Sequence, residues 1–286
     1  MQLRALLAQA TAQLAEAGVD TPALDARLLF QHASGLTHEA LVAQPTREVT
    51  VAIEAQFFSY IRARLARTPV AQIVGTKPFW KDEFLVSRAV LTPRPETEIM
   101  LEALLRRQPN HSVPYRIAEL GVGSGCLLLS ALREYPNAIG VGVDISAQAL
   151  EVARANAEKL GLSARIRWRE GNWCEAFAQS ETFDIVLSNP PYIPSNQLPD
   201  LAPELRVHEP ALALDGGADG LNSYRAILSC LPAHLSASSV VLFEVGAGQA
   251  PDVAELAESC GFEAVETVYD LAQIARIVIV TFNATR

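Results

Sequence analysis

The strongest constraint on the fold is a regular alternation of strand-like and helix-like segments that begins at Arg116. Apolar runs predict strands near 116–120, 138–143, 165–169, 183–188, 239–245, 262–269 and 275–282, and helical spacing predicts helices near 125–134, 146–160, 222–233 and 251–260. Strands that alternate with helices form a mostly parallel sheet with helices on both faces. The last two strands are joined by too few residues for a crossover helix, so we expect them to pair antiparallel. This part of the chain therefore predicts an α/β fold.

The first part of the chain follows a different pattern. From Leu3 to about Arg67 the apolar residues recur at helical spacing, which predicts three to four short helices. Thr21 followed by Pro22 is typical of a helix start, because a hydroxyl can cap the helix and proline lacks an N–H that would have no partner there. These residues predict a small all-helical domain.

Between these parts, the residues after Gly75 are rich in aromatic and alternating apolar side chains, which is typical of a hairpin or an extended connector. Two stiffening prolines then precede a predicted helix that ends near Arg107. We expect three parts: a helical substrate-recognition domain (1–71), a hairpin connector (72–95) and a catalytic domain (96–286).

Several classes of protein are disfavoured by composition. No apolar run approaches the ~18 residues of a membrane span, and the N-terminus does not resemble a signal peptide, so we expect a soluble cytoplasmic protein. The five histidines form no HxxxH pair, so we expect no metal. The cysteines form no CxxC pair, so we interpret all four as unpaired residues in a reducing compartment: Cys126, Cys174, Cys230 and Cys260.

The net charge of −9 is unevenly distributed. Residues 1–95 hold 10 Lys and Arg against 8 Asp and Glu, whereas the remainder holds 13 against 24. Because binding to nucleic acid depends on clustered positive charge, the acidic part is a poor candidate for that role.

A glycine-rich turn follows the first strand of the predicted sheet. Glycine permits left-handed backbone angles and lets a ligand approach the main chain closely. The GxGxG spacing lacks the third glycine of the dinucleotide fingerprint, and similar turns serve NAD, FAD and purely structural bends. Its position between a strand and a helix favours a nucleotide-like cofactor, so six residues are predicted to bind one: Glu119, Gly121, Val122, Gly123, Ser124 and Gly125.

Asp144 ends the second predicted strand, where a carboxylate can accept hydrogen bonds from both hydroxyls of a ribose. A helix cap is the alternative role, but Ser146 is already available for it. Glu119 and Asp144 would repel a pyrophosphate, because no Lys or Arg stands nearby in the sequence. S-adenosylmethionine has a cationic sulfur and no phosphate, so it fits these residues better.

After the third strand, Trp173 can supply an apolar face for an adenine ring and Asn172 can offer amide groups to its edge. The alternative is a core tryptophan beside a turn asparagine. We predict that both residues bind the cofactor.

The sequence Asn189-Pro190-Pro191-Tyr192 follows the fourth strand, at the edge where open α/β sheets bind ligands. A conjugated planar NH2 group is a poor nucleophile. The Asn189 side-chain oxygen and the Pro190 carbonyl could each accept one N–H and hold its lone pair toward a sulfonium methyl, while Tyr192 packs on the substrate. Asn189, Pro190 and Tyr192 are the predicted catalytic residues, Pro191 joins them in substrate binding, and Asn189 also borders the cofactor. No general base is assigned.

These motifs, with the segment Thr92–Glu98, resemble the PrmC/HemK family, the release factor glutamine-N5 methyltransferases. The similarity runs nearly the whole chain and includes Gly75–Trp80, His208–Tyr224 and Phe243–Gln249. It implies a helical N-terminal domain, a seven-stranded Rossmann-like methyltransferase domain and S-adenosyl-L-methionine. The implied reaction methylates the glutamine side-chain amide in the GGQ motif of class-1 peptide chain release factors. By position, it implies that Gly121, Gly123, Gly125, Asp144 and Trp173 contact the cofactor and that residues 189–192 contact the glutamine.

The sequence departs from the family at two positions: Glu119 stands where many relatives have Asp, and Asn172 where an acid is common. Two other functions remain open. A DNA or RNA adenine-N6 methyltransferase would use the same tetrapeptide on a flipped adenine, but should carry a basic recognition region. A non-catalytic S-adenosylmethionine-binding scaffold would need no exposed acceptors. We expect a monomer that binds release factors and neither membrane nor nucleic acid.

Overall fold

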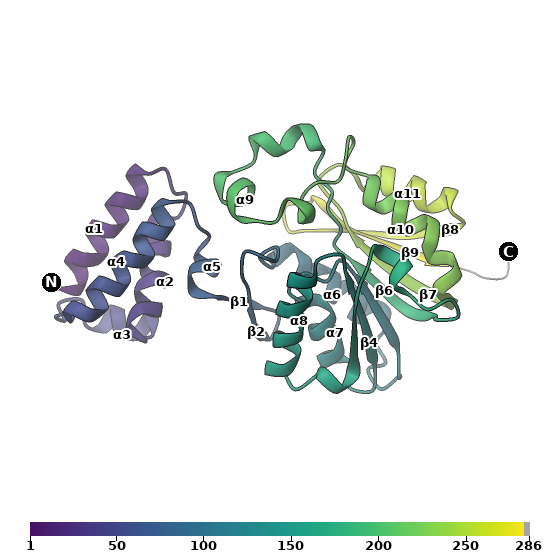
Figure 1. The fold of residues 1–286 in the computed structure, drawn as a ribbon, viewed down its shortest axis with the longest axis horizontal. Helices are drawn as coiled ribbons and strands as arrows, with labels where there is room; N and C mark the ends of the chain where they lie inside the picture. The colour runs from purple at the N-terminus through teal and green to yellow at the C-terminus, as the bar shows by residue number, and fades with distance from the viewer. Residues whose placement is uncertain (283–286) are drawn as a thin grey trace. The chain divides into compact units, whose positions relative to one another are not determined.

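The computed structural model describes residues 1–282, which divide into two compact units (Figure 1). The first unit comprises Met1–Thr76 together with the short segment Ala202–His208. The second comprises Lys77–Leu201 and the residues from Glu209 to the end of the described chain. Across the described residues, no helix combines the length and the apolar character that crossing a membrane requires.

The first unit consists of short helices around an apolar core. They are α1 (Leu3–Glu16), α2 (Pro22–Ser34), α3 (His38–Ala43), α4 (Val51–Leu65), α5 (Val70–Val74) and α9 (Pro203–His208). Leu6 and Leu14 of α1, Leu29 of α2 and Phe57 of α4 are fully buried in this core. The helical pattern expected from Leu3 to about Arg67 is confirmed by α1 to α4, and the five-residue α5 follows it.

Thr21 begins α2 in a way that the sequence did not predict. Its side chain makes no capping hydrogen bond, and its hydroxyl instead donates to Asp25 Oδ1 at 2.8 Å, one turn into the helix. The expected hydroxyl cap is therefore wrong at this position. Thr21 has a φ of −122° and a ψ of 53°, outside the extended backbone region usual for a capping residue, and its hydroxyl is turned toward Asp25, which a buried arginine holds in place.

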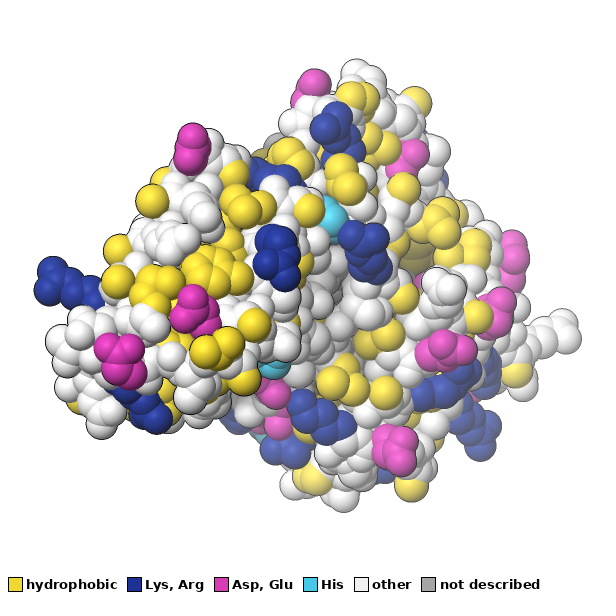
Figure 2. All heavy atoms as spheres, turned by 60° about the vertical axis from the view of Figure 1, so that its left-hand side comes forward, with side chains coloured by type: hydrophobic (Ala, Val, Ile, Leu, Met, Phe, Trp, Pro, Cys, Tyr) yellow, Lys and Arg dark blue, Asp and Glu magenta, His cyan; other side chains and the backbone are white. Residues whose placement is uncertain are grey.

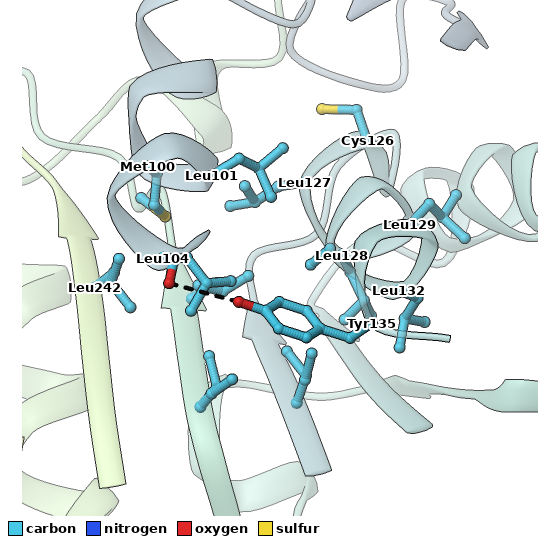
Figure 3. Packing of buried hydrophobic residues seen from close by; sticks show 14 of the residues in the cluster. Met100, Leu101, Leu104, Cys126, Leu127, Leu128, Leu129, Leu132, Tyr135 and Leu242 are labelled. Carbon is cyan, nitrogen blue, oxygen red and sulfur yellow. Dashed lines mark hydrogen bonds between the residues drawn. The ribbon is translucent and has the colours of Figure 1, made fainter. Parts of the chain in front are cut away.

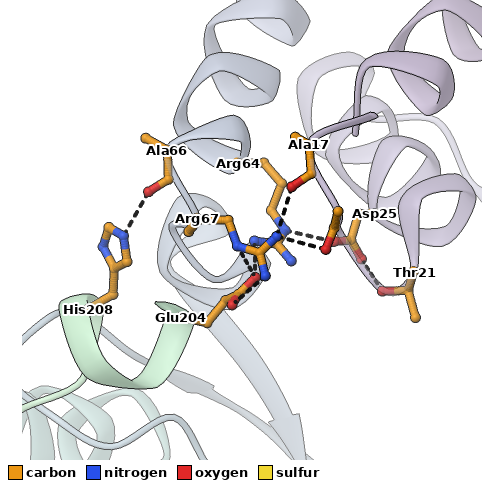
Figure 4. Close-up of polar contacts among 9 residues, drawn as sticks. Ala17, Thr21, Asp25, Arg64, Ala66, Arg67, Glu204 and His208 are labelled. Carbon is orange, nitrogen blue, oxygen red and sulfur yellow. Dashed lines mark hydrogen bonds and ion pairs between the residues drawn. The ribbon is translucent and has the colours of Figure 1, made fainter. Parts of the chain in front are cut away.

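That arginine, Arg64 of α4, lies between two carboxylates (Figure 4). Its Nε donates to Asp25 Oδ2 at 2.7 Å and its Nη1 to Glu204 Oε1 at 2.8 Å, while Arg67 also contacts Glu204. Burial lowers the pKa of the Arg64 guanidinium, but the hydrogen bonds and charges of both carboxylates outweigh it and raise the pKa above its ordinary value. His208 Nε2 lies 2.9 Å from the Ala66 carbonyl. The segment 202–208 thus joins the helical unit, although it follows residue 201 of the second unit in the chain.

The second unit is an α/β layer structure. Its helices are α6 (Pro95–Arg107), α7 (Cys126–Glu134), α8 (Ala147–Lys159), α10 (Asn222–Cys230) and α11 (Ala250–Ser259). Its sheet contains β3 (Arg116–Leu120), β4 (Ile139–Asp144), β5 (Ile166–Glu170), β6 (Phe183–Ser188), β7 (Leu235–Glu244), β8 (Phe262–Tyr269) and β9 (Ala275–Phe282). A separate two-stranded sheet, β1 (Thr76–Phe79) with β2 (Asp82–Leu85), forms the expected hairpin.

The seven strands are arranged in the order β5-β4-β3-β6-β7-β9-β8. The pairs from β5 to β7 are parallel, whereas β9 is antiparallel to both β7 and β8. The seven-stranded α/β prediction and the antiparallel pairing of the last two strands are both confirmed. After β3 the chain passes to β4 on one side and later to β6 on the other. Such a reversal of strand order leaves a crevice at the carboxyl ends of the strands, where open α/β sheets bind ligands.

A leucine-rich layer packs α6 and α7 onto the sheet (Figure 3). Leu104 of α6, Leu128 and Leu132 of α7, and Leu242 of β7 are fully buried there. Burial of each such side chain contributes about 1.5–3 kcal/mol. Tyr135 closes the layer, with its hydroxyl donating to the Gln108 carbonyl at 2.9 Å. This packing fixes α7 and, with it, the glycine-rich turn that precedes the helix.

Two of the cysteines contradict the sequence interpretation. Cys174 and Cys230 form a disulfide across 56 residues of sequence, whereas Cys126 and Cys260 are unpaired. Cys174 lies in the short 3-10 helix η2 (Trp173–Ala176), and Cys230 ends α10. The expectation of four unpaired cysteines is therefore wrong for this pair. Cysteine spacing could not reveal it, because only the tertiary packing of η2 against α10 brings the two backbones to a Cα–Cα distance of 5.9 Å.

Candidate active site

A cavity of about 310 Å³ lies in the second unit at the carboxyl ends of the parallel strands. Segments after β3, β4, β5 and β6 line it, together with the loop before α6 and residues from Pro210 to Asp215. Its lining includes three acids, Glu119, Asp144 and Asp215, and one base, Arg94. An acid-rich, largely apolar cavity favours a ligand that carries positive charge.

The glycine-rich turn forms one wall of this cavity. Gly121, Val122, Gly123 and Ser124 all line it, as the sequence placed them. Gly123 has a φ of +52° and donates its N–H to Asp144 Oδ2 at 2.9 Å, so the turn is tied to the end of β4. A left-handed backbone of this kind favours glycine.

Gly125 differs from the other predicted turn residues because it does not line the cavity. A Cβ at this position would lie 3.2 Å from Ala153 and 3.3 Å from both Leu129 and Trp168. The residue therefore serves close packing at the start of α7. The third glycine of related turns has the same physical role, which is to let a helix approach its neighbours.

Asp144 lies at the end of β4 with both carboxylate oxygens in use. Oδ1 accepts the Ser146 N–H at 2.9 Å, and Oδ2 accepts the Gly123 N–H. Burial raises the pKa of this carboxyl, while the backbone hydrogen bonds oppose the rise. Ser146 caps α8 by accepting the Ala149 N–H, as the sequence analysis expected. Asp144 is thus left as a rigid acceptor on the cavity wall.

Glu119 is 3% exposed and reaches the cavity from β3. Its Oε2 accepts the Leu128 N–H at 3.0 Å, within the first turn of α7. Burial raises the pKa of Glu119 well above its ordinary value, and the charge of Asp144 adds to the rise. A bound cation would stabilise the ionised form of buried carboxyls whose pKa is raised in this way.

Trp173 and Asn172 line the cavity beyond β5. Trp173 has a φ of +49°, which is uncommon for a bulky residue, and its ring lies 3.5 Å from the position of a Cβ on Gly121. Sparsely populated backbone conformations persist where the surrounding structure over-determines them, often at ligand sites. The indole is held against the glycine-rich turn.

Asn189 enters the cavity from the end of β6. Its Nδ2 donates to Thr97 Oγ1 at 3.3 Å, whereas the hydrogen bonds found among the described residues leave its Oδ1 unused. Ser188 before it is buried and donates its hydroxyl to the Leu120 carbonyl at 2.8 Å, which fixes the strand end. Catalysis by Asn189 would require that its oxygen is not already bonded to the protein's own backbone. No such bond to Oδ1 is found among the described residues.

The other residues of the tetrapeptide divide between the cavity and its support. Pro191 lines the cavity, while Pro190 is buried beside it. Tyr192 packs its ring against the core of the second unit, and burial raises the pKa of its phenol to about 12. Its carbonyl accepts the Gln249 Nε2 donor at 2.9 Å. Neither Pro190 nor Tyr192 contributes to the cavity wall.

Glycines make room for this bend. A Cβ on Gly220 would lie 2.4 Å from the Tyr192 carbonyl oxygen, and one on Gly246 would lie 2.6 Å from Gln249 Oε1. Gln249 accepts the Gly246 N–H with that oxygen at 3.0 Å, so one amide joins two backbone segments. The tetrapeptide is thus held by a rigid clamp rather than by a mobile loop.

Sequence reasoning assigned no role to several of these residues. Thr97 lines the cavity and donates to buried Glu244, and Gln249 holds Tyr192. Thr97 lies in the segment 92–98, and Glu244 and Gln249 lie in the segment 243–249. Both segments contributed to the family resemblance, but no chemical role was predicted for these three residues. Residues 89–91, expected to form an extended connector, instead make a turn that lines the cavity. Among the described residues, no group of three His, Cys, Asp or Glu side chains is placed to hold a metal ion.

Comparisons with known proteins show which families this chain is similar to. The PrmC N-terminal domain family matches residues 5–75, and the Methyltransferase small domain family matches residues 95–213. A release factor glutamine methyltransferase of Caulobacter vibrioides is 42% identical over 267 residues, covering 93% of this chain and 92% of that protein. One of Cereibacter sphaeroides is 41% identical over 273 residues, covering 95% of each.

Among solved structures, a T. thermophilus 16S rRNA methyltransferase in complex with AdoMet and guanosine shares the fold. The TM-score is 0.51 at 18% identity, over 73% of this chain and 50% of that one. This likeness concerns the arrangement of helices and strands alone.

Proposed function

This chain belongs to the family of release factor glutamine methyltransferases, and from this membership we propose its reaction. It transfers a methyl group from S-adenosylmethionine to the side-chain amide nitrogen of the glutamine in the GGQ motif of class-1 peptide chain release factors. The observation that carries the proposal is the position of Asn189, which lines an acid-rich cavity with its Oδ1 unused and its Nδ2 anchored.

The cavity fits S-adenosylmethionine, which supplies a methyl group on a cationic sulfur. Carboxylates of Glu119 and Asp144 lie on its wall, while Trp173 offers an apolar face. The one basic side chain in the lining, Arg94, is 3.5 Å from the Glu209 carboxylate, so the acids outnumber the bases that a pyrophosphate would need. In our assignment Asp144 accepts from the ribose hydroxyls and Trp173 and Asn172 border the adenine. The glycine-rich turn lies along the ligand, with Glu119, Gly121, Val122, Gly123 and Ser124 in contact and Gly125 acting through packing.

The reaction requires a planar amide nitrogen to be held and aimed. Asn189 Oδ1 and the Pro190 carbonyl each accept one N–H of the glutamine in this proposal, and Pro191 and Tyr192 shape the bend. Fixed acceptors contribute by orientation and by stabilising the positive charge that grows on nitrogen. We assign no general base to the site, so the proton leaves to solvent after transfer.

A labelling experiment tests the proposed function. The protein is incubated with S-adenosylmethionine that carries a labelled methyl group and with either a release factor or duplex DNA, and the label is located by mass spectrometry. We expect it on the glutamine of the GGQ motif. Label on adenine would instead support the adenine-N6 alternative, and label on neither would support a binding protein without catalysis.

Charge supports the protein substrate over nucleic acid. Residues 96–286 hold an excess of acids, and on the face drawn in Figure 2 the Lys and Arg side chains lie interspersed with Asp and Glu. Binding to the phosphate backbone of a nucleic acid requires clustered positive charge. We therefore propose that the protein acts as a cytoplasmic monomer on release factors and binds no nucleic acid directly.

We further propose that the helical part, residues 1–71, recognises the release factor, since its charge balance differs from that of the remaining chain. Amide hydrogen exchange of the intact protein tests this proposal. We expect slower exchange within residues 1–71 when a release factor is added. Protection confined to the second unit would contradict a recognition role for the helices.

Asp144→Ala is predicted to weaken binding of S-adenosylmethionine by about 10- to 100-fold, because each lost hydrogen bond to a charged acceptor costs about 1.5–3 kcal/mol. Asp144→Asn keeps one acceptor oxygen, so its affinity for S-adenosylmethionine should lie between that of Asp144→Ala and that of the wild type. Isothermal titration calorimetry measures both. Glu151→Ala on α8 is a matched control for the loss of an exposed acid. Unchanged affinity in Asp144→Ala would remove this residue from the ribose.

A further inference from the structure

A buried chain of hydrogen bonds leads from the candidate active site into the interior of the second unit. Glu244 ends β7 and is 3% exposed, and Thr97 lies on α6. Thr97 Oγ1 donates to Glu244 Oε2 at 2.6 Å, and Asn189 Nδ2 donates to Thr97 Oγ1 at 3.3 Å. The chain therefore connects a buried carboxyl to the amide that faces the cavity.

The direction of these bonds follows from the number of protons that each group can offer. An ionised carboxylate only accepts, so the single hydroxyl proton of Thr97 is committed to Glu244. Thr97 Oγ1 then has lone pairs alone to offer Asn189. The amide must therefore turn its NH2 toward Thr97 and the neighbouring Glu244 carboxyl, which also accepts from the Asn189 side chain. Because the two ends of an amide point in different directions, Asn189 Oδ1 is left for a ligand in the cavity.

We propose that Thr97 and Glu244 are positioning residues that select the orientation of the Asn189 amide, so that an acceptor and not a donor meets the substrate NH2. The inference rests on the proposed function, in which Asn189 Oδ1 accepts an N–H of the glutamine. A neutral Glu244 can donate to Thr97, whose proton can then go to Asn189. The reversed amide presents NH2 to NH2, and two donors cannot form a hydrogen bond.

The electrostatic surroundings of Glu244 make this selection sensitive to pH. Burial raises the pKa of the Glu244 carboxyl to about 7, while hydrogen bonds from the side chains of Thr97 and Asn189 oppose the rise. Tyr224 donates to the main-chain carbonyl of Glu244 at 2.7 Å. The titratable and charged groups that face this carboxyl are Glu96 of α6, Cys126 of α7, Tyr192 after β6, Tyr224 of α10 and Arg276 of β9. Of these, Glu96 raises the pKa and Arg276 lowers it.

Ionisation of Glu244 is expected to lower the stability of the fold and to raise the rate of turnover. The pKa in the fold lies above the ordinary value of 4.5, so the fold favours the neutral carboxyl. Glu244 therefore reduces stability progressively as pH rises from about 4.5 through about 7. Turnover, in contrast, needs the ionised form and should rise through the same region. A residue that only supported the fold would not produce this opposition.

The first test distinguishes the effect of the Thr97 hydroxyl from the effect of the side-chain volume. Thr97→Val keeps the volume and removes one of the two acceptors that face the Asn189 NH2, the other being the Glu244 carboxyl. We expect kcat to fall about 10- to 100-fold, the scale of a misplaced reacting group, with KM and cofactor affinity within about threefold. Thr97→Ser restores the hydroxyl and should recover most of kcat. Thr46→Val, an exposed threonine of the helical unit, is the control for the substitution itself. Wild-type kcat in Thr97→Val would overturn the proposal.

The second test uses pH. Wild-type kcat should fall on the acidic side of about pH 7, where Glu244 becomes protonated. Glu244→Gln cannot ionise, so its kcat should be lower at alkaline pH and lack this acidic limb, whereas its thermal stability above about pH 7 should equal or exceed that of wild type. Glu255→Gln, an exposed acid of α11, should retain the wild-type profile. An unchanged acidic limb in Glu244→Gln would overturn the role of this carboxyl.

The outcomes also separate this inference from the proposed function. If wild-type protein does not label the release factor glutamine, the function itself fails. If it does, and Thr97→Val and Glu244→Gln keep its kcat and pH profile, only the positioning role fails. Should Thr97→Val not fold, Thr97→Ser and Glu244→Gln still decide through the pH profile, and calorimetry with S-adenosylmethionine reports whether each variant retains a folded cofactor site.

Discussion

Asn189→Ala is expected to lower kcat for release factor methylation by about 100- to 1,000-fold, the cost of removing one fixed group that stabilises charge in a transition state. Binding of S-adenosylmethionine should change by no more than a few-fold. The physical reason is that the Asn189 side chain only borders the proposed cofactor site, whereas its Oδ1 is the acceptor proposed for the glutamine. Single-turnover transfer of labelled methyl and calorimetry measure the two quantities separately.

The matched control for this variant is Asn196→Ala, which truncates an exposed asparagine in the 3-10 helix η3 (Ser195–Asp200). It should leave both kcat and cofactor affinity as in wild type. If Asn189→Ala loses affinity and turnover by the same factor, the amide belongs to the cofactor site and not to a separate glutamine site. That result would also remove the basis for the positioning roles of Thr97 and Glu244.

Arg64→Ala is expected to destabilise the helical unit by about 3–5 kcal/mol, because it leaves the Asp25 and Glu204 carboxylates without their buried partner. The side chain of Arg64 is 8% exposed, so water cannot replace the lost hydrogen bonds without opening the structure. Hydrogen exchange of the core amides of α2 and α4 gives the free energy of unfolding of this unit. Exchange in the segment 202–208 should accelerate with it.

Arg62→Ala provides a control on the same helix, since Arg62 is exposed. Surface substitutions of this kind usually change stability by no more than about 0.5 kcal/mol. Equal destabilisation by the two variants would mean that the loss of helix propensity or net charge, and not the buried ion pairs, causes the effect. Cofactor affinity should remain as in wild type in both variants, because the cavity lies in the second unit.

Much of the fold could be predicted because its signals are local. Alternating apolar runs set the strands from Arg116 onward, and the short link before β9 required an antiparallel pair. The strand ends that carry Gly121, Asp144 and Asn189 could be predicted to lie together, since parallel strands place their carboxyl ends at one edge. The features of the candidate site that depend only on residue type and position in the chain could therefore be predicted from the sequence.

Other features could not be read in this way because they depend on contacts between distant segments. The disulfide joins residues 56 positions apart, and Arg64 meets Glu204 across 140 positions. Thr97 meets Glu244 across 147 positions. No periodicity or spacing rule encodes such pairs, because their distance is set by how helices and strands pack.

The sequence by itself thus determined the α/β class, the glycine-rich turn and the acceptor-bearing tetrapeptide at a strand end. Tertiary structure alone decided that Gly125 lies in tight packing away from the cavity wall, that residues 202–208 join the helical unit, and which end of the Asn189 amide is hydrogen-bonded to Thr97. The physical reason is range: backbone preferences and side-chain alternation act over a few residues. Burial, proton direction and ion pairing depend on partners that only the complete fold brings within hydrogen-bond distance.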